Sequence, residues 1–128
     1  MKILFLDDDK VRHVQFKSVV QQNKHDIDYV YTSNACISKL KSNVYDIVFL
    51  DHDLGGQIYV EETKGSGYEV ALYMENSLDK TFLPKNVIIH SFNPAGAERM
   101  FVSLKKVISN TIMIPFMHNN YINLVKTL

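Results

Sequence analysis

The chain has 128 residues, of which 46% are hydrophobic and 22% are charged, a composition typical of a soluble globular domain. Fourteen basic residues balance fourteen acidic ones, so neither a coat on duplex DNA nor an anionic membrane surface is expected as partner. The single cysteine, Cys36, excludes a disulfide framework and a four-cysteine zinc module. The apolar run at residues 3–6 is too short for a signal peptide, and no stretch is long enough to span a membrane. We therefore expect one domain over residues 1–128, located in the cytoplasm.

Strand and helix patterns alternate along the chain. Short apolar runs typical of strands buried on both faces of a parallel sheet occupy residues 3–6, 27–31, 47–50, 87–89 and 112–114. Amphipathic periodicity predicts helices over residues 10–23, 33–41, 66–77, 97–108 and 121–128, with Ser33 or Asn34 capping the second. This alternation predicts an α/β fold, a flavodoxin-like three-layer sandwich. Its five-stranded parallel sheet is expected to have the order 2-1-3-4-5, with helices on both faces.

The segment from Leu54 to Gly67 does not fit the pattern of short connections. It holds four glycines, follows the third strand and has no helical or strand periodicity. A long loop at that position is more often functional than filler. Tyr59 and Tyr68, in and beside this segment, could stack on a base, although packing in the core or on the surface is the commoner fate of such tyrosines.

Five of the nine aspartates fall into two clusters, at residues 7–9 and 51–53, each directly after an apolar strand. Ligands of an open parallel sheet collect at the carboxyl ends of its strands, and strands one and three are neighbours in the expected order. Converging carboxylates repel one another unless a cation neutralises them, and their oxygens are the donors that Mg²⁺ or Mn²⁺ prefers. The clusters therefore predict a divalent-metal site. The alternative is that they are acidic ends that interact only with helix dipoles.

Candidates for proton transfer and anion binding follow the fourth strand. His90, or as second choice His52, could move a proton near neutral pH. The residues from Asn93 to Gly96 open a helix whose free N–H groups suit an anion, and Pro94 fits the first helical turn. A metal at the aspartates would polarise a phosphoryl oxygen and present a water molecule.

The two arginines of the chain, Arg12 and Arg99, follow the first and the fourth strand. The planar fork of arginine suits bidentate contact with a phosphate, so both are candidate phosphate ligands, with chance placement on the surface as the alternative. His13, His25 and His118 have no recognisable partner in the sequence and are expected at the surface.

Three sequence blocks resemble the receiver domain of response regulators. They are Ile-Leu-Phe-Leu-Asp-Asp-Asp at residues 3–9, Tyr-Asp-Ile-Val-Phe-Leu-Asp at 45–51 and Asn-Val-Ile-Ile-His-Ser at 86–91. The resemblance implies that Asp7 and Asp8 are the metal-side acidic pair. It also implies that Asp51 is the phosphoacceptor, that Ser91 is the hydroxyl residue and that the backbone carbonyl of Asp53 completes the metal shell.

The chain departs from ordinary receivers at the fifth strand, where Ile114 stands in place of the usual lysine before Pro115. That lysine pairs with the phosphorylated aspartate, so its replacement argues against ordinary phosphorelay signalling. Blocks such as Leu-Asp-His-Asp-Leu-Gly at 50–55 and His-Ser-Phe-Asn-Pro-Ala-Gly-Ala-Glu-Arg-Met at 90–100 are similar to the cyclic-phosphate processing receiver family. The role implied by that resemblance is action on cyclic phosphates of nucleotides or RNA ends.

Three functions are compatible with these features. The first is a receiver-like domain that uses Mg²⁺ or Mn²⁺ to bind or process such a phosphate, as a metal-dependent phosphodiesterase would. The second is a stand-alone phosphoacceptor receiver, and the third is a non-catalytic module that binds a nucleotide or a protein. The candidate site residues are Asp51, His52, His90 and Ser91 for catalysis, Arg12, Asn93, Gly96 and Arg99 for phosphate, and Asp7, Asp8, Asp51 and Asp53 for metal.

Overall fold

A computed structural model describes residues 1–54, 65–114 and 119–128 of the chain. Most of the glycine-rich loop, with Tyr59, lies outside the described residues, as do Pro115 and His118. The strands are β1 (Lys2–Leu6), β2 (Asp26–Val30), β3 (Ile47–Leu50), β4 (Asn86–Ile89) and β5 (Asn110–Met113). The helices are α1 (Lys10–Val19), α2 (Ser33–Ser42), α3 (Gly67–Asn76), α4 (Pro94–Lys105) and α5 (Asn119–Thr127), with short 3-10 turns at Gln22–Lys24 and Lys80–Phe82.

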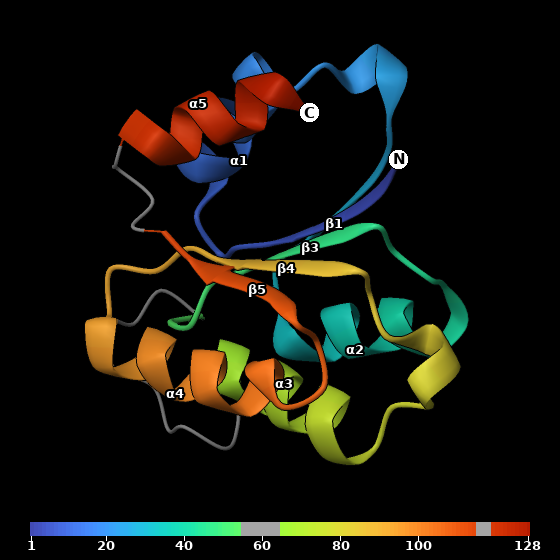
Figure 1. The fold of residues 1–128 in the computed structure, drawn as a ribbon. Coiled ribbons are helices and arrows are strands. Elements are labelled where there is room, and N and C mark those ends of the chain that lie inside the picture. The colour runs from blue at the N-terminus through green and yellow to red at the C-terminus, as the bar shows by residue number, and fades with distance from the viewer. Residues whose placement is uncertain (55–64, 115–118) are drawn as a thin grey trace.

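The five strands form one parallel sheet in the order β2-β1-β3-β4-β5, as the β-α alternation predicts. Helices α1 and α5 cover one face of this sheet, and α2, α3 and α4 cover the other (Figure 1). The result is the expected three-layer α/β sandwich of the flavodoxin-like type. None of the described helices combines the length and the apolar character that crossing a membrane requires.

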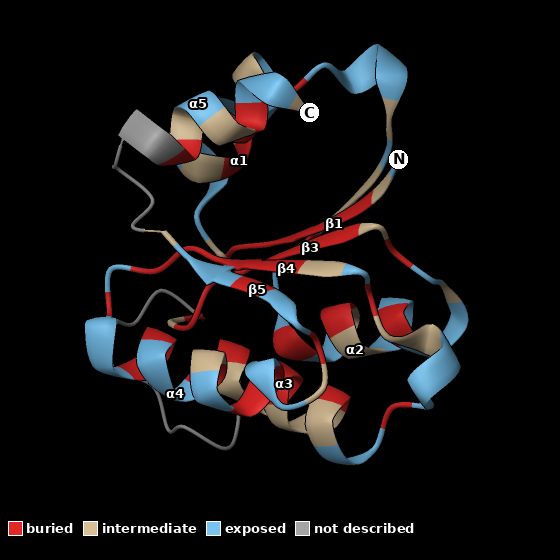
Figure 2. Ribbon diagram, in the orientation of Figure 1, coloured by how far each residue is buried: buried red, intermediate tan, exposed pale blue. Residues whose placement is uncertain are grey.

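Two hydrophobic clusters hold the layers together, one on each face of the sheet. Side chains alternate along each strand, so Phe5 packs with Phe16 of α1 and Tyr121 of α5, whereas Leu4 packs toward the opposite helices. The central strands are buried along nearly their whole length (Figure 2). They therefore hold the residues that follow their carboxyl ends in fixed positions.

The structure differs from the sequence-based expectations at several element ends. The first helix ends at Val19 rather than at residue 23, because Val20 adopts an extended backbone before a 3-10 turn. The fourth helix begins at Pro94, three residues before its amphipathic repeat but where the Asn93–Gly96 segment predicts a first turn, because Asn93 caps it. The expectation that every strand is buried on both faces is wrong for the two edge strands: only Val30 of β2 is buried, and Ile112 and Met113 of β5 are exposed.

Candidate functional site

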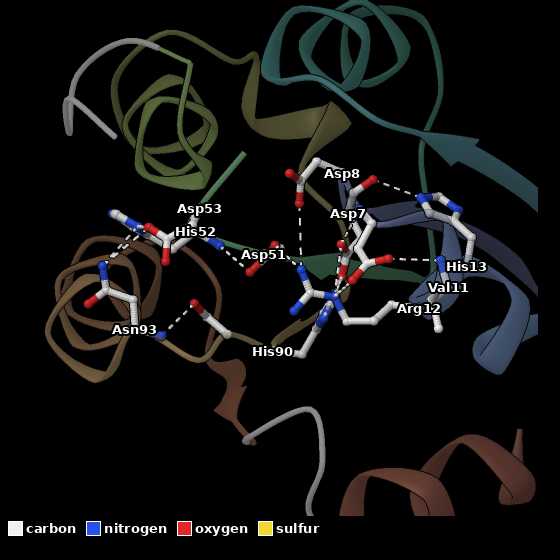
Figure 3. Close-up of polar contacts among 12 residues, drawn as sticks. Asp7, Asp8, Val11, Arg12, His13, Asp51, His52, Asp53, His90 and Asn93 are labelled. Carbon is white, nitrogen blue, oxygen red and sulfur yellow. Dashed lines mark hydrogen bonds and ion pairs between the residues drawn. The ribbon is translucent and has the colours of Figure 1, made fainter. Parts of the chain in front are cut away.

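The carboxyl ends of β1 and β3 bring three aspartates together. Leu6 and Leu50 are register partners in this parallel pair, so the next residues, Asp7 and Asp51, emerge from the sheet side by side. Asp8 joins them, and each of the three contributes a carboxylate oxygen within 4.8 Å of the other two (Figure 3). Residues that are 44 positions apart thus form the acidic cluster that the sequence predicts.

Arg12 lies inside this acidic cluster. Its Nε atom is 3.0 Å from Asp7 Oδ2, and its Nη2 atom is 3.2 Å from Asp51 Oδ2 and 3.5 Å from Asp8 Oδ1. Helix α1 positions this side chain, because Asp9 caps the helix by accepting a hydrogen bond from the Val11 N–H group. The residue expected to bind phosphate is here the counter-ion of the three carboxylates.

Arg12 supplies a single positive charge for three carboxylates. The buried acidic cluster therefore keeps an excess of negative charge. Burial is the main reason why the pKa of Asp51 is raised to about 8, with repulsion from Asp7 adding to the rise and Arg12 opposing it. Burial likewise raises the pKa of Asp7 to about 6, against a backbone hydrogen bond from Asp9 and the charge of Arg12. The cluster therefore favours an added positive charge, either protons or a cation.

The acidic cluster fits a divalent metal by the chemistry of its donors. Mg²⁺ and Mn²⁺ prefer hard carboxylate oxygens, and three such groups on two strand ends leave room for water and substrate oxygens. The side chain of Asp53 does not join this cluster, because its Oδ1 atom lies 2.8 Å from His52 Nδ1 and accepts a hydrogen bond from Asn93 Nδ2 at 3.3 Å. The role expected for the Asp53 backbone carbonyl stays a prediction.

His52 and Asp53 form a buried pair next to the acidic cluster. The His52 side chain is only 1% exposed, and among the described residues its Nε2 atom has no hydrogen-bond partner. Because a carboxylate can only accept, the contact with Asp53 places the ring proton on Nδ1 and leaves Nε2 as an acceptor.

Gly96 is where α4 packs on the His52 ring. A Cβ atom at this position would lie 2.6 Å from two ring carbons of His52. Asn93 caps the helix by accepting a hydrogen bond from the Gly96 N–H group at 3.0 Å, and its own N–H donates to Ser91 Oγ at 3.1 Å. Two of the N–H groups expected to bind an anion are therefore already used within the helix start.

Gly67 is a site residue that the sequence places only at the junction of the glycine-rich loop and the predicted helix 66–77. A Cβ atom there would lie 1.8 Å from the carbonyl oxygen of Asp51, and the Gly67 N–H group donates to the His52 carbonyl at 2.8 Å. The start of α3 thus presses directly on the backbone of the acidic cluster. The glycine itself is visible in the sequence, but the close approach is a property of the folded chain.

His90 lies beneath the acidic cluster, fully buried among aromatic rings. Its ring stacks on Phe5 with centroids 5.1 Å apart, and its Nδ1 atom is 3.6 Å from Asp7 Oδ2. Burial, with a smaller contribution from the charge of Arg12, lowers the pKa of His90 to about 3. A proton shuttle at neutral pH needs a pKa near 7, so this environment argues against His90 in that role.

The expectation that His13 lies at the surface is wrong. Its side chain is 1% exposed, its Nε2 atom is 2.7 Å from the Asp7 carbonyl oxygen, and its ring stacks on Tyr31 with centroids 4.1 Å apart. This contact between α1 and the end of β1 holds the Asp7 backbone in place. The sequence offers no signal for it, because the partner is a main-chain oxygen.

Two surface hollows hold further candidate residues, and of these two the second adjoins the acidic cluster. Arg99 is exposed on α4 and lines a groove with Tyr68 and Glu75 of α3. A second hollow, of about 480 Å³, adjoins Asp8 and is lined by residues of the β2–α2 connection and by two residues beside the undescribed loop: Tyr31, Thr32, Ser33, Asn34, Leu54 and Gly65. Thr32, rather than Ser33 or Asn34, caps α2, because its hydroxyl accepts the Ala35 N–H group.

Comparison with known proteins places this geometry in a family. The family described as the cyclic-phosphate processing receiver domain matches residues 2–106. The chain belongs to this family. None of the curated proteins matches the chain in sequence.

Solved structures of receiver domains share the fold. A two-component response regulator from Clostridium difficile is 20% identical with a TM-score of 0.70, over 99% of this chain and 92% of that one. The response regulator TrrA from Thermotoga maritima, solved in complex with Mg²⁺ and BeF, is 21% identical with a TM-score of 0.63, over 98% and 96%. The Mn²⁺-bound response regulator Rcp1 is 15% identical with a TM-score of 0.64, over 98% and 89%.

Proposed function

We propose that this receiver-family domain binds a divalent cation and binds or processes a phosphate ester, namely a cyclic phosphate of a nucleotide or RNA end. The observation that carries the proposal is the convergence of Asp7, Asp8 and Asp51 within 4.8 Å at adjacent strand ends, in a chain of the cyclic-phosphate processing family. Mg²⁺ or Mn²⁺ is the proposed cofactor, held by these three carboxylates and by the backbone carbonyl of Asp53.

The bound cation would supply a Lewis acid for a phosphoryl oxygen, and neighbouring residues would handle protons. His52 is the better candidate base, because Asp53 holds its ring with Nε2 as the acceptor atom. His90 and Ser91 are then positioning residues. His90 packs under Asp7, and Ser91 accepts the Asn93 N–H group at the start of α4.

The phosphate and the nucleoside would occupy different surfaces around the acidic cluster. For the phosphate, Arg12 supplies a guanidinium beside the carboxylates, the start of α4 at Asn93 and Gly96 supplies the positive end of a helix dipole, and Arg99 lies further along the same helix. For the nucleoside, the hollow of about 480 Å³ beside Asp8 falls within the size range of small-molecule sites.

Turnover of a panel of 2′,3′- and 3′,5′-cyclic nucleotides with Mg²⁺ or Mn²⁺ tests this function. Asp51→Ala and His52→Gln should abolish turnover while circular dichroism shows that both variants fold. Asp26→Asn is a matched control, because Asp26 is an exposed carboxylate at the amino end of β2, opposite the acidic cluster, and should keep full turnover. Neither turnover nor binding across the whole panel would remove the proposal.

A phosphoacceptor receiver is the second candidate, favoured by the position of Asp51 at the carboxyl end of β3 and by a fold shared with a regulator solved with Mg²⁺ and BeF. Acetyl phosphate with Mg²⁺ should then add one phosphoryl group to Asp51, and intact mass spectrometry without that addition would count against it. Ile114 in place of the receiver lysine ranks this function second. Tight nucleotide or protein binding without product would instead identify a non-catalytic module.

We propose that residues 1–128 form one receiver-like domain. The protein would be located in the cytoplasm, where nucleotides and RNA ends are available as substrates. A protein partner is compatible with it, and pull-down with the immobilised chain would identify one.

A further inference from the structure

Arg12 forms ion pairs with all three carboxylates that would hold a metal. Its Nε and Nη2 atoms lie 3.0 and 3.2 Å from Asp7 Oδ2 and Asp51 Oδ2, the carboxylate oxygens of two of the three candidate ligands. A bound Mg²⁺ lies about 2.0–2.1 Å from its ligand oxygens. The guanidinium donates to Asp7 Oδ1 at 3.1 Å and to Asp51 Oδ2 at 3.2 Å, so a metal that binds these carboxylates competes with Arg12 for their oxygens.

The aromatic ring of Phe92 offers the Arg12 guanidinium an alternative partner beside the acidic cluster. Its Cζ atom lies 5.2 Å from the centre of the Phe92 ring, and Phe92 is 57% exposed on the connection between β4 and α4. The arginine side chain is itself 14% exposed, so its guanidinium is at the boundary between the acidic cluster and solvent. A guanidinium that leaves the carboxylates can stay stacked on this ring while it turns toward the start of α4.

We propose that Arg12 is a built-in counter-ion of the acidic cluster, which the divalent cation displaces, and that the displaced guanidinium then binds the phosphate of the ligand. This inference rests on the proposed function, because it takes the acidic cluster as the metal site. It adds that metal and phosphate bind cooperatively. Without phosphate the metal must break the ion pairs of Arg12, whereas with phosphate the released guanidinium gains a new partner.

The coupling must act in both directions. If phosphate raises the affinity for metal by some factor, metal raises the affinity for phosphate by the same factor, because both belong to one thermodynamic cycle. The domain would then hold metal firmly only when its phosphate ligand is present. Tight binding at this site would then require the metal and the phosphate together, and the Arg12 side chain would cause this requirement.

Titration with Mn²⁺, followed by calorimetry and by the electron paramagnetic resonance of the free ion, tests the inference without any measurement of turnover. Arg12→Gln removes the resident guanidinium and should lower the Kd for Mn²⁺ at least about tenfold, the equivalent of one lost ion pair of about 1.4 kcal/mol. Inorganic phosphate should tighten Mn²⁺ binding to the wild type but not to Arg12→Gln. Sodium chloride at matched ionic strength should have no such effect.

Two further variants separate the outcomes. Arg12→Lys keeps the charge and guards against misfolding of Arg12→Gln; it should bind Mn²⁺ with intermediate affinity and show weaker coupling to phosphate. Lys10→Gln is the matched control, because Lys10 is exposed at the start of the same helix and the substitution removes the same charge, and it should behave as the wild type does.

Failure of this inference is distinguishable from failure of the proposed function. Equal Mn²⁺ affinity in the wild type, Arg12→Gln and Arg12→Lys would overturn the displacement of Arg12 and leave the metal site standing. Mn²⁺ binding that phosphate does not affect in the wild type would overturn the capture of phosphate by the guanidinium. No Mn²⁺ binding by any variant, with or without phosphate, would overturn the metal site and this inference together.

Discussion

The substitution Gly67→Ala tests how closely helix α3 packs on the acidic cluster. The added Cβ atom would lie 1.8 Å from the Asp51 carbonyl oxygen, whereas ordinary contacts are 3.4–4 Å, so the two backbones must separate by at least about 1.6 Å. Such a movement also strains the hydrogen bond from the Gly67 N–H group to the His52 carbonyl, at present 2.8 Å long. The Cε atom of Met100, 2.9 Å from the added Cβ atom, can turn away, but the Asp51 backbone cannot.

Overpacking of a well-packed core costs about 1–3 kcal/mol, and a clash between two backbones belongs at or above the upper end of that range. We therefore expect Gly67→Ala to lower the free energy of unfolding by about 3 kcal/mol. Because Asp51 moves with its carbonyl, the Kd for Mn²⁺ should rise about tenfold to hundredfold, the usual effect of disturbing the supports of a metal ligand.

Urea denaturation and Mn²⁺ titration measure the two effects. Gly96→Ala is a graded comparison, since its Cβ atom meets the His52 ring at 2.6 Å instead of a backbone, and we expect a loss of about 1–2 kcal/mol with unchanged Mn²⁺ affinity. Gln15→Ala, at an exposed position of α1, should change the stability by less than about 0.5 kcal/mol. Wild-type stability and Mn²⁺ affinity in Gly67→Ala would refute the close packing of α3 on Asp51.

Three more predictions concern the buried groups of the site. The pKa of Asp7 is raised to about 6 and that of Asp51 to about 8, so the native protein holds protons that the unfolded chain loses above about pH 4. The free energy of unfolding, measured by urea titration, should therefore fall as the pH rises from about 4 to about 8. Bound Mg²⁺ should reduce this loss of stability. His90→Phe should gain stability relative to the wild type as pH falls from 6.5 toward 3, because the lowered pKa of His90 lets the unfolded wild type alone take up a proton there; parallel curves would contradict this. Asn93→Ala removes the cap on the Gly96 N–H group and should cost about 1–2 kcal/mol in the same assay, and an unchanged midpoint would show that the cap contributes nothing.

The environments of the two candidate histidines could not be predicted from the sequence. His90 and His52 both follow a strand, and the sequence-based interpretation ranks His90 first. The fold buries His90 under the aromatic ring of Phe5 and lowers its pKa, whereas it holds His52 against Asp53. Burial depends on which rings the other strands and helices bring to the same place, and local sequence does not contain that information.

The sequence by itself determined the α/β architecture and the meeting of the two aspartate clusters. Apolar runs that alternate with amphipathic segments favour a parallel sheet, and in such a sheet the carboxyl ends of neighbouring strands lie at one edge, so Asp7 and Asp51 had to approach each other. Only the tertiary structure decided that Arg12 pairs with this acidic cluster and that Gly67 must have no side chain. Both depend on contacts of a few ångströms between segments distant in sequence, and strand and helix periodicity does not encode distances of that size.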